Sequence, residues 1–332
     1  QLLETSRYFK LVCGAGNEDC DEVRKLAFVY TLAGCNGFDV SASPSVVSSC
    51  REGIEKALSF EHKYYASEKS KPFITVSVGM PGDHHVRKAY IIDSCVNCDL
   101  CIPVCPTNAI PESLIINEQL CIGCGNCEAV CPPAANAIRY RHNAKELSRI
   151  LPECVDAGAE SIELHAGVPD DSTTLDEWKV VCENMPNGMV SMCLDRYHMT
   201  NVHLIDRIKM AKDIAGDRLI IQADGIPMSG GTDDFNTTLQ AVSIADIVNK
   251  ELVRKDLRFR KLPILISGGT NTHTGDLARQ CGVNFGGITI GTHARKIVSN
   301  QLTGSFEGDK SQLEDAVKAA RNLIVKNLGL PS

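Results

Sequence analysis

Short apolar runs alternate with amphipathic stretches along most of this chain. Each apolar run has the length of a buried strand, and the stretch after it repeats apolar residues every three or four positions, as one face of a helix does. In the helix predicted at residues 21–33, Val23, Leu26, Ala27 and Tyr30 share one face. The pattern predicts strands at residues 11–14, 37–41, 73–78, 161–165, 189–194, 219–223, 263–267 and 287–291, and helices at residues 21–33, 45–65, 144–157, 175–182, 202–214, 237–250, 276–280 and 313–328.

Eight strands that alternate with eight helices predict a (β/α)₈ barrel of the TIM type. The alternative is an open doubly wound sheet, but no GxGxxG motif follows the first strand. The alternation is interrupted after the third strand. We therefore expect residues 1–85 and 141–332 to form the barrel and residues 86–140 an inserted module. Loops from a strand to the next helix lie at the mouth of such a barrel, so the module is expected there.

The inserted segment contains two cysteine runs with the spacing of bacterial ferredoxins, which bind [4Fe–4S] clusters through thiolates. In that motif three cysteines of a run ligate one cluster and the fourth ligates the other cluster. One cluster is therefore predicted to take Cys95, Cys98, Cys101 and Cys131, and the other Cys105, Cys121, Cys124 and Cys127.

The two runs form an internal repeat. The first cysteines, Cys95 and Cys121, are 26 residues apart, and each half contains an Ala-Ile pair, at residues 109–110 and 137–138. Paired zinc sites are the alternative, because they also use CxxC pairs. A zinc site does not require two copies of a four-cysteine run that each end in proline, so the repeat favours iron–sulfur clusters.

The composition excludes several classes of protein. Hydrophobic residues make up 43% and charged residues 23% of the 332 positions, as in globular proteins. No run approaches the roughly 18 apolar residues of a membrane-spanning helix. The net charge is 34 − 41 = −7 and no long basic run occurs, so no nucleic-acid partner is expected. Sixteen cysteines are too sparse for a disulfide scaffold of this length, which favours reduced or metal-bound thiols.

The module is acidic. Between residues 91 and 140 there is one base, Arg139, against five acids, Asp93, Asp99, Glu112, Glu118 and Glu128. A protein redox partner or larger assembly that docks on this surface is therefore predicted to be basic.

Glycine-rich segments follow the seventh and eighth predicted strands, where many barrels bind a phosphate group. Backbone N–H groups of glycine can approach phosphate oxygens, so an FMN phosphate could bind there. Tight turns that need glycine are the alternative interpretation. The candidate phosphate or flavin residues are Gly268, Gly269, Thr270, Gly291, Thr292 and Arg295.

Polar residues also occupy the predicted strand ends. Glu163 and His165 are two residues apart and so share one face of a strand. A carboxylate beside an imidazole could transfer protons, or the two could belong to a buried hydrogen-bonded network. Comparable positions on other strands hold Asp39, Asp195, Arg196, Gln222 and Asp224, and Cys13 is the candidate reactive thiol. Seven further cysteines, Cys20, Cys35, Cys50, Cys154, Cys182, Cys193 and Cys281, are predicted to be small buried hydrophobic residues.

Several segments resemble the light-dependent period protein family of cyanobacteria. They are residues 10–15, 30–34 and 39–40 near the N-terminus, the GGTN-x-HT segment at residues 268–274, and residues 285–287 and 294–296. The internal ferredoxin module lies in the same place as in that family. The resemblance implies an iron–sulfur protein that senses redox state and adjusts the circadian period to light. It also implies a photosynthetic setting, either the chloroplast stroma or the cyanobacterial cytoplasm.

Two functional classes follow from these observations. In the first, the protein is a two-cluster electron-transfer or redox-sensing protein and the barrel is a body for docking. In the second, it is an FMN-dependent oxidoreductase in which the clusters supply electrons to a flavin at the barrel mouth.

Overall fold

The computed structural model describes residues 1–60, 71–81, 83, 87–121, 123–142, 146–226, 232–302 and 310–331. The predicted domain boundary at residues 85–86 and the ends of two predicted helices, residues 61–65 and 144–145, lie outside these ranges. The division into three segments therefore stays a prediction. None of the described helices is long and apolar enough to cross a membrane.

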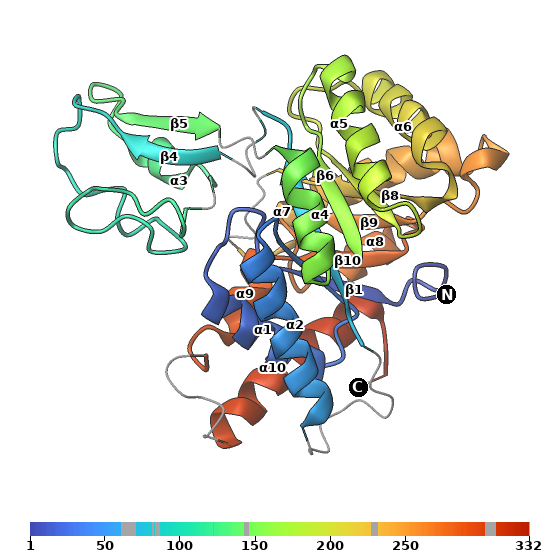
Figure 1. The fold of residues 1–332 in the computed structure, drawn as a ribbon, viewed down its shortest axis with the longest axis horizontal. Coiled ribbons are helices and arrows are strands. Elements are labelled where there is room, and N and C mark those ends of the chain that lie inside the picture. The colour runs from blue at the N-terminus through green and yellow to red at the C-terminus, as the bar shows by residue number, and fades with distance from the viewer. Residues whose placement is uncertain are drawn as a thin grey trace.

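Eight parallel strands close into a barrel, which confirms the predicted fold class (Figure 1). Neighbouring strands pair in chain order around the ring, and the last strand pairs with the first. The barrel strands are β1 (Tyr8–Val12), β2 (Gly37–Ser41), β3 (Phe73–Gly79), β6 (Ser161–His165), β7 (Val190–Leu194), β8 (Leu219–Asp224), β9 (Ile264–Ser267) and β10 (Gly287–Ile290).

Helices cover the outside of the barrel. Their apolar faces pack on the strands and on each other. Two neighbouring helices are also joined by the hydrogen bond that the Trp178 indole donates to the Ala211 carbonyl at 3.1 Å. The outer helices are α1 (Cys20–Leu32), α2 (Pro44–Ser59), α4 (Leu147–Ala157), α5 (Asp171–Asn184), α6 (Asn201–Ala215), α7 (Phe235–Val248), α8 (Thr274–Gln280), α9 (Thr292–Val298) and α10 (Lys310–Leu328). Shorter helical turns are α3 (Asn126–Val130), η1 (Gly216–Arg218), η2 (Asn249–Val253) and η3 (Leu257–Phe259).

Helix α9 was not predicted, since the segment after the strand at residues 287–291 was interpreted as a glycine-rich loop. The helix begins directly after β10, with Gly291 at its N-cap and no side-chain hydrogen bond to mark the start. A helix of seven residues without a capping side chain carries a weak sequence signal.

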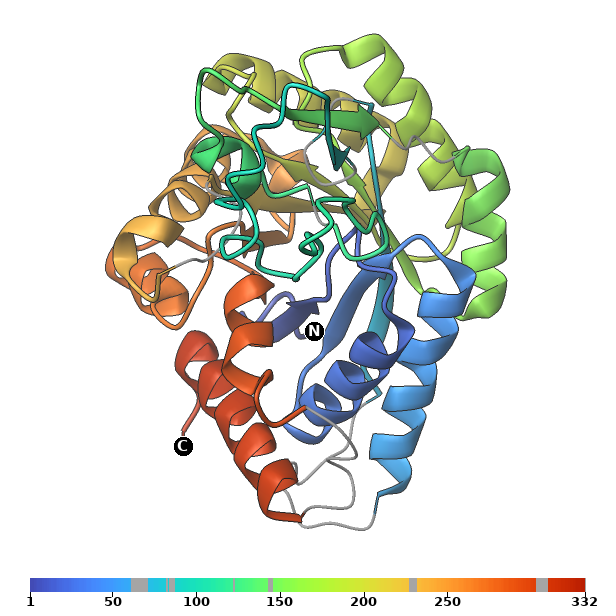
Figure 2. The same cartoon turned by 90° about the vertical axis from the view of Figure 1, so that its left-hand side faces the viewer.

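The cysteine-rich module is bounded by a two-stranded antiparallel sheet of β4 (Arg87–Ile91) and β5 (Ile138–His142). It has a small core of its own, in which Ala89, Ile110 and Ile138 pack against the buried cysteines. Figures 1 and 2 show the module on one side of the barrel. The buried amine of Lys88 donates to the carbonyl of Gly16, in the loop after β1. The module thus contacts the face at which the barrel strands end, as expected.

Candidate metal centres and the barrel mouth

Four cysteines line a first cavity in the module. Cys95, Cys98 and Cys101 come from the first run and Cys131 from the second. Cys101 is buried whereas Cys98 is exposed, so this cavity lies close to the surface.

A second cavity is lined by Cys121, Cys124 and Cys127 of the second run and by Cys105 of the first. The structure therefore brings the eight cysteines together as two groups of four, and each group contains the fourth cysteine of the other run. Burial, followed by the nearby thiols of Cys124 and Cys121, raises the pKa of Cys127 to about 12.

The fourth cysteine of each run accepts a hydrogen bond from the backbone N–H of an alanine. The N–H of Ala109 donates to Cys105 Sγ at 3.2 Å, and the N–H of Ala137 donates to Cys131 Sγ at 3.3 Å. These alanines begin the repeated Ala-Ile pairs. The repeat therefore places an N–H donor on sulfur in each half, and such donors stabilise negative charge on a cluster thiolate.

The two runs also share an unusual backbone. Gly123 and Gly125 adopt positive φ angles of 68° and 86° in the second run. The residues 26 positions earlier, Asn97 and Asp99, have φ angles of 52° and 58°. Asn and Asp tolerate this left-handed conformation better than most residues with a side chain. The first run therefore makes the same turns without glycine.

The sulfur positions separate the cluster and zinc interpretations. A Zn–S bond is about 2.3 Å long, so four thiolates around one zinc ion lie about 3.8 Å apart. Among the described residues, no three of the eight cysteine sulfurs lie within 4.8 Å of one another. Each group is therefore too widely spaced for a single ion and fits a larger inorganic group.

Sequence reasoning missed a set of contacts beside the second cavity. The guanidinium of Arg87 lies 3.8 Å from the centre of the Tyr140 ring and donates to the Gly123 carbonyl at 2.9 Å. The Tyr140 hydroxyl donates to Glu128 at 2.9 Å. These contacts connect the two-stranded sheet of β4 and β5 to the second cysteine run. Alternation of apolar and polar residues along 138–141 was the available signal for this two-stranded sheet.

Three of the candidate phosphate residues, Gly268, Gly269 and Thr270, form a turn that already contacts other parts of the barrel. Gly268 and Gly269 have positive φ angles of 71° and 66°, and a Cβ atom at Gly268 would collide with the backbone of Gly225. The Thr270 hydroxyl donates to the Thr289 carbonyl at 2.7 Å. These contacts match the alternative interpretation, in which the glycines form tight turns.

The remaining three candidates belong to α9 or to its N-cap. Gly291 is its N-cap, Thr292 is its first residue and Arg295 lies in its last turn. The Arg295 Nε is buried and has no hydrogen-bond partner among the residues that the structure describes. Since β9 and β10 are neighbours, these residues and the Gly268 turn follow adjacent strands.

The barrel interior contains a charged network centred on Lys10. Its amine contacts Asp39 at 3.0 Å and Glu163 at 2.7 Å, and all three side chains are buried. Gln222 donates to Glu163 at 2.6 Å, and the Ser77 hydroxyl donates to Asp39. The buried network that was predicted as one alternative is therefore present.

Other strand-end predictions have mixed outcomes. Asp195 and Asp224 are buried, whereas Arg196 is exposed and does not belong to the interior. Cys13 is completely buried, and burial raises the pKa of its thiol well above the ordinary value. Reactive cysteines have lowered pKa values, so the prediction of a reactive thiol was wrong. Of the seven cysteines predicted to be buried, Cys281 is exposed and Cys20 is partly exposed.

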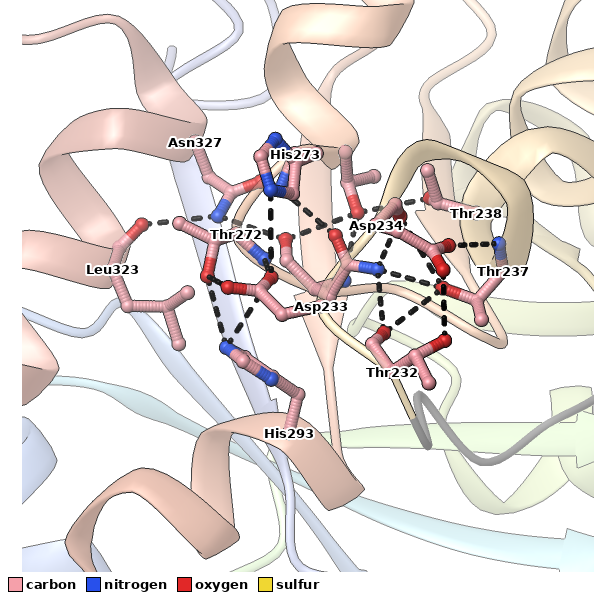
Figure 3. Close-up of polar contacts among 12 residues, drawn as sticks. Thr232, Asp233, Asp234, Thr237, Thr238, Thr272, His273, His293, Leu323 and Asn327 are labelled. Carbon is pink, nitrogen blue, oxygen red and sulfur yellow. Dashed lines mark hydrogen bonds and ion pairs between the residues drawn. The ribbon is translucent and has the colours of Figure 1, made fainter.

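A further polar cluster joins the loops after β8 and β9 to helix α9 (Figure 3). The Thr272 hydroxyl donates to Asp233 at 2.9 Å and lies 2.9 Å from His293 Nε2. The side-chain amide of Asn271 donates to the carbonyls of Thr232 and Asp234. The GGTN-x-HT segment was noted in the sequence as a family feature, but its contacts with residues 232–234 were not anticipated.

Comparison with known proteins places these features in a family. Residues 89–110 match the 4Fe-4S binding domain and residues 113–159 match the 4Fe-4S dicluster domain. The light dependent period A protein of Synechococcus elongatus is 29% identical over 341 residues, which cover 98% of this chain and 92% of that protein.

Two solved structures are also similar. A truncated 3-deoxy-D-arabino-heptulosonate 7-phosphate synthase from Thermotoga maritima is 14% identical with a TM-score of 0.45, covering 96% of this chain and 88% of its own. A deoxyribose-phosphate aldolase from Toxoplasma gondii is 13% identical with a TM-score of 0.46, covering 96% and 94%.

The chain thus combines an eight-stranded parallel barrel with a ferredoxin-type 4Fe–4S segment between its third and fourth strands. Residues 154–326, which are 173 of the 332 positions, match the light dependent period A C-terminal domain. This protein is a member of the light dependent period A family.

Proposed function

We propose that the protein binds two [4Fe–4S] clusters and exchanges single electrons through them. Cys95, Cys98, Cys101 and Cys131 would hold one cluster, and Cys105, Cys121, Cys124 and Cys127 the other. The observation that carries this proposal is the crossed grouping of the cysteines around two cavities. When bound, such clusters supply one-electron redox chemistry, and the chain tunes it through burial and N–H donors on sulfur.

We further propose that the protein senses redox state for a light-dependent regulatory process. The name of the Synechococcus elongatus relative supports this role, since the two proteins align over nearly their full lengths. The site of action would be the cyanobacterial cytoplasm or the chloroplast stroma. In this role the barrel is a docking body that passes on the redox state of the module.

Electrons would enter or leave through the surface around the first cavity. Val96 and Leu100 line this cavity, yet they are 62% and 50% exposed. Asp99 also lines this cavity, and Asp93 and Glu112 are each two positions along the chain from a lining residue. All three acids are exposed and form no ion pair with any other described residue. An apolar surface with unpaired acids around it is complementary to a partner redox protein whose docking face is apolar at its centre and basic at its rim.

The alternative is an FMN-dependent oxidoreductase with a phosphate site formed by Gly268, Gly269, Thr270, Gly291, Thr292 and Arg295. The buried Arg295 Nε, which has no partner among the described residues, is the observation on its side. Two contacts argue against the phosphate site. The Thr270 hydroxyl already donates to a backbone carbonyl, and the backbone of Gly225 packs directly against Gly268. We therefore favour the redox-sensing role.

Anaerobic purification tests both functions in one preparation. We expect about eight iron atoms per chain and the visible absorption of [4Fe–4S] clusters, with no flavin released on denaturation. Protein that retains zinc instead of iron after anaerobic reconstitution would contradict the cluster assignment. Flavin released at one equivalent per chain would favour the oxidoreductase.

A further inference from the structure

The barrel interior contains a second group of possible metal ligands, remote in sequence from the cysteine runs. Glu163 and His165 lie on β6, and Cys193 lies on the neighbouring strand β7. The strand register pairs His165 with Cys193, and all three side chains are buried. One ligand atom from each residue lies within 4.8 Å of the other two.

These distances suit one small cation. Glu163 Oε1 and His165 Nε2 are 3.5 Å apart. Ligands at the usual zinc bond lengths of about 2.0–2.1 Å stand about 3.3–3.4 Å apart in a tetrahedron. Carboxylate oxygen, imidazole nitrogen and thiolate sulfur are also the three ligand types that zinc accepts in proteins. Cys193 Sγ lies within 4.8 Å of both atoms, and a tetrahedral zinc ion would hold the sulfur about 3.6 Å from each of them.

Gln222 already directs a hydrogen-bond donor toward this position. Its amide nitrogen lies 2.6 Å from Glu163 Oε1 and 3.5 Å from Cys193 Sγ. In this orientation its Oε1 is buried and has no hydrogen-bond partner among the described residues. A half-turn of the amide would direct Oε1 toward the same ligands, which is favourable only if a cation lies between them.

The surrounding charges also favour a cation. Asp224, Glu163 and Asp83 are the negative groups that act on Cys193. Lys10 is the nearby positive group, but its amine binds Asp39 and the other oxygen of Glu163, Oε2, at 2.7 Å. Glu163 Oε1 therefore remains directed toward His165 and Gln222.

We propose that Glu163, His165 and Cys193 bind one zinc ion at the barrel mouth, with Gln222 Oε1 as the fourth ligand. On binding, the Cys193 thiol releases its proton to solvent and the sulfur bonds to the metal. This site is independent of the iron–sulfur clusters and would hold zinc whether or not the clusters transfer electrons.

The test uses the full chain, purified anaerobically with its iron, exposed to excess zinc and then dialysed against a weak chelator. We expect one zinc per chain in addition to about eight iron atoms. X-ray absorption at the zinc edge should show a single sulfur neighbour at about 2.3 Å together with oxygen or nitrogen neighbours. Four sulfur neighbours would place the zinc in the cysteine runs and overturn the proposal, as would full iron content without retained zinc.

Variants provide the matched comparison. Cys193→Ser should lower the retained zinc at least about tenfold and leave the iron content unchanged. Cys182→Ser, at another buried cysteine, should retain both metals. Gln222→Glu should bind zinc at least about tenfold more tightly, because it replaces an amide ligand with a carboxylate. Equal zinc binding by the wild type, Cys193→Ser and Gln222→Glu proteins would refute the site even if Cys193→Ser folded poorly.

Discussion

The amine of Lys88 donates a hydrogen bond to the carbonyl oxygen of Gly16 at 2.7 Å, and this contact joins the cysteine-rich module to the barrel. The same amine donates to the carbonyl of Cys121 at 2.7 Å. Gly16 lies in the loop after β1, and Cys121 begins the second cysteine run. One buried side chain thus connects a cluster-binding segment with the mouth of the barrel.

Replacing Lys88 should loosen this connection. Lys88→Met leaves two buried carbonyl groups without their charged donor, and we expect the free energy of unfolding to fall by about 3 kcal/mol. Chemical denaturation of the cluster-loaded protein measures this loss. Lys179→Met is the control, since Lys179 forms an exposed pair with Asp176 and should change stability by less than about 1 kcal/mol. An equal effect of the two substitutions would show that Lys88 does not hold the module in place.

The crossed grouping of cysteines can be tested with two double variants. If Cys105 belongs with Cys124, then Cys105→Ala with Cys124→Ala damages one cluster and leaves about four iron atoms per chain. Cys105→Ala with Cys98→Ala damages both clusters and leaves almost none. Iron analysis of anaerobic protein distinguishes the two. The reverse result would mean that each run binds a cluster by itself.

The acids around the first cavity should steer a basic partner. Asp99→Asn with Glu112→Gln should slow electron transfer from the reduced protein to a basic c-type cytochrome by about tenfold at low salt. Salt should remove the difference, because ions screen exposed charges. Stopped-flow absorbance measures these rates.

The matched control removes two acids elsewhere in the module. Glu118→Gln with Glu128→Gln changes the net charge equally, but Glu118 pairs with Arg141 at 3.2 Å and Glu128 accepts from Tyr140. We expect a smaller effect from this pair. A small uncharged quinone oxidant should react equally with all variants, which separates loss of docking from loss of redox activity.

His293 should make stability depend on pH. Burial lowers the pKa of His293 below 6.5, helped by Lys296 and His273 and opposed by Asp233. The folded state therefore binds this proton more weakly than the unfolded state does. The associated stability is complete above pH 6.5 and is lost as the pH falls through the folded pKa.

We therefore expect the free energy of unfolding to decrease more steeply between about pH 7 and pH 5 in the wild type than in His293→Gln. Denaturant titrations across this range provide the measurement. His198→Gln, at an exposed histidine, should keep the wild-type pH profile. Parallel profiles for wild type and His293→Gln would show that the histidine titrates alike in both states.

Much of the fold was predictable because its signals are local. Buried parallel strands appear as short apolar runs, and the predicted ranges 37–41 and 161–165 coincide with β2 and β6. The antiparallel pairing of β4 with β5 was not predicted, since these two strands are separated by the whole cysteine segment. Helix α9 was missed because its seven residues follow a strand without a capping side chain.

The site was predictable where chemistry imposes spacing along the chain, as in the cysteine runs. It was not predictable where strand-end residues meet across the barrel. Glu163 and His165 were recognised as sharing a face, but Cys193 was expected to be an ordinary buried residue. Likewise, nothing local indicates that Thr272 would meet both Asp233 and His293.

By itself the sequence determined the order of the elements, the eight cysteines of the module and the place of the module after the third barrel strand. These features depend on covalent spacing and on periodic burial, which act over a few residues. Tertiary structure alone decided which distant side chains meet. Closure of the barrel and the register of its strands bring Glu163, Cys193 and Gln222 to one point, and the docking of the module brings Lys88 to Gly16.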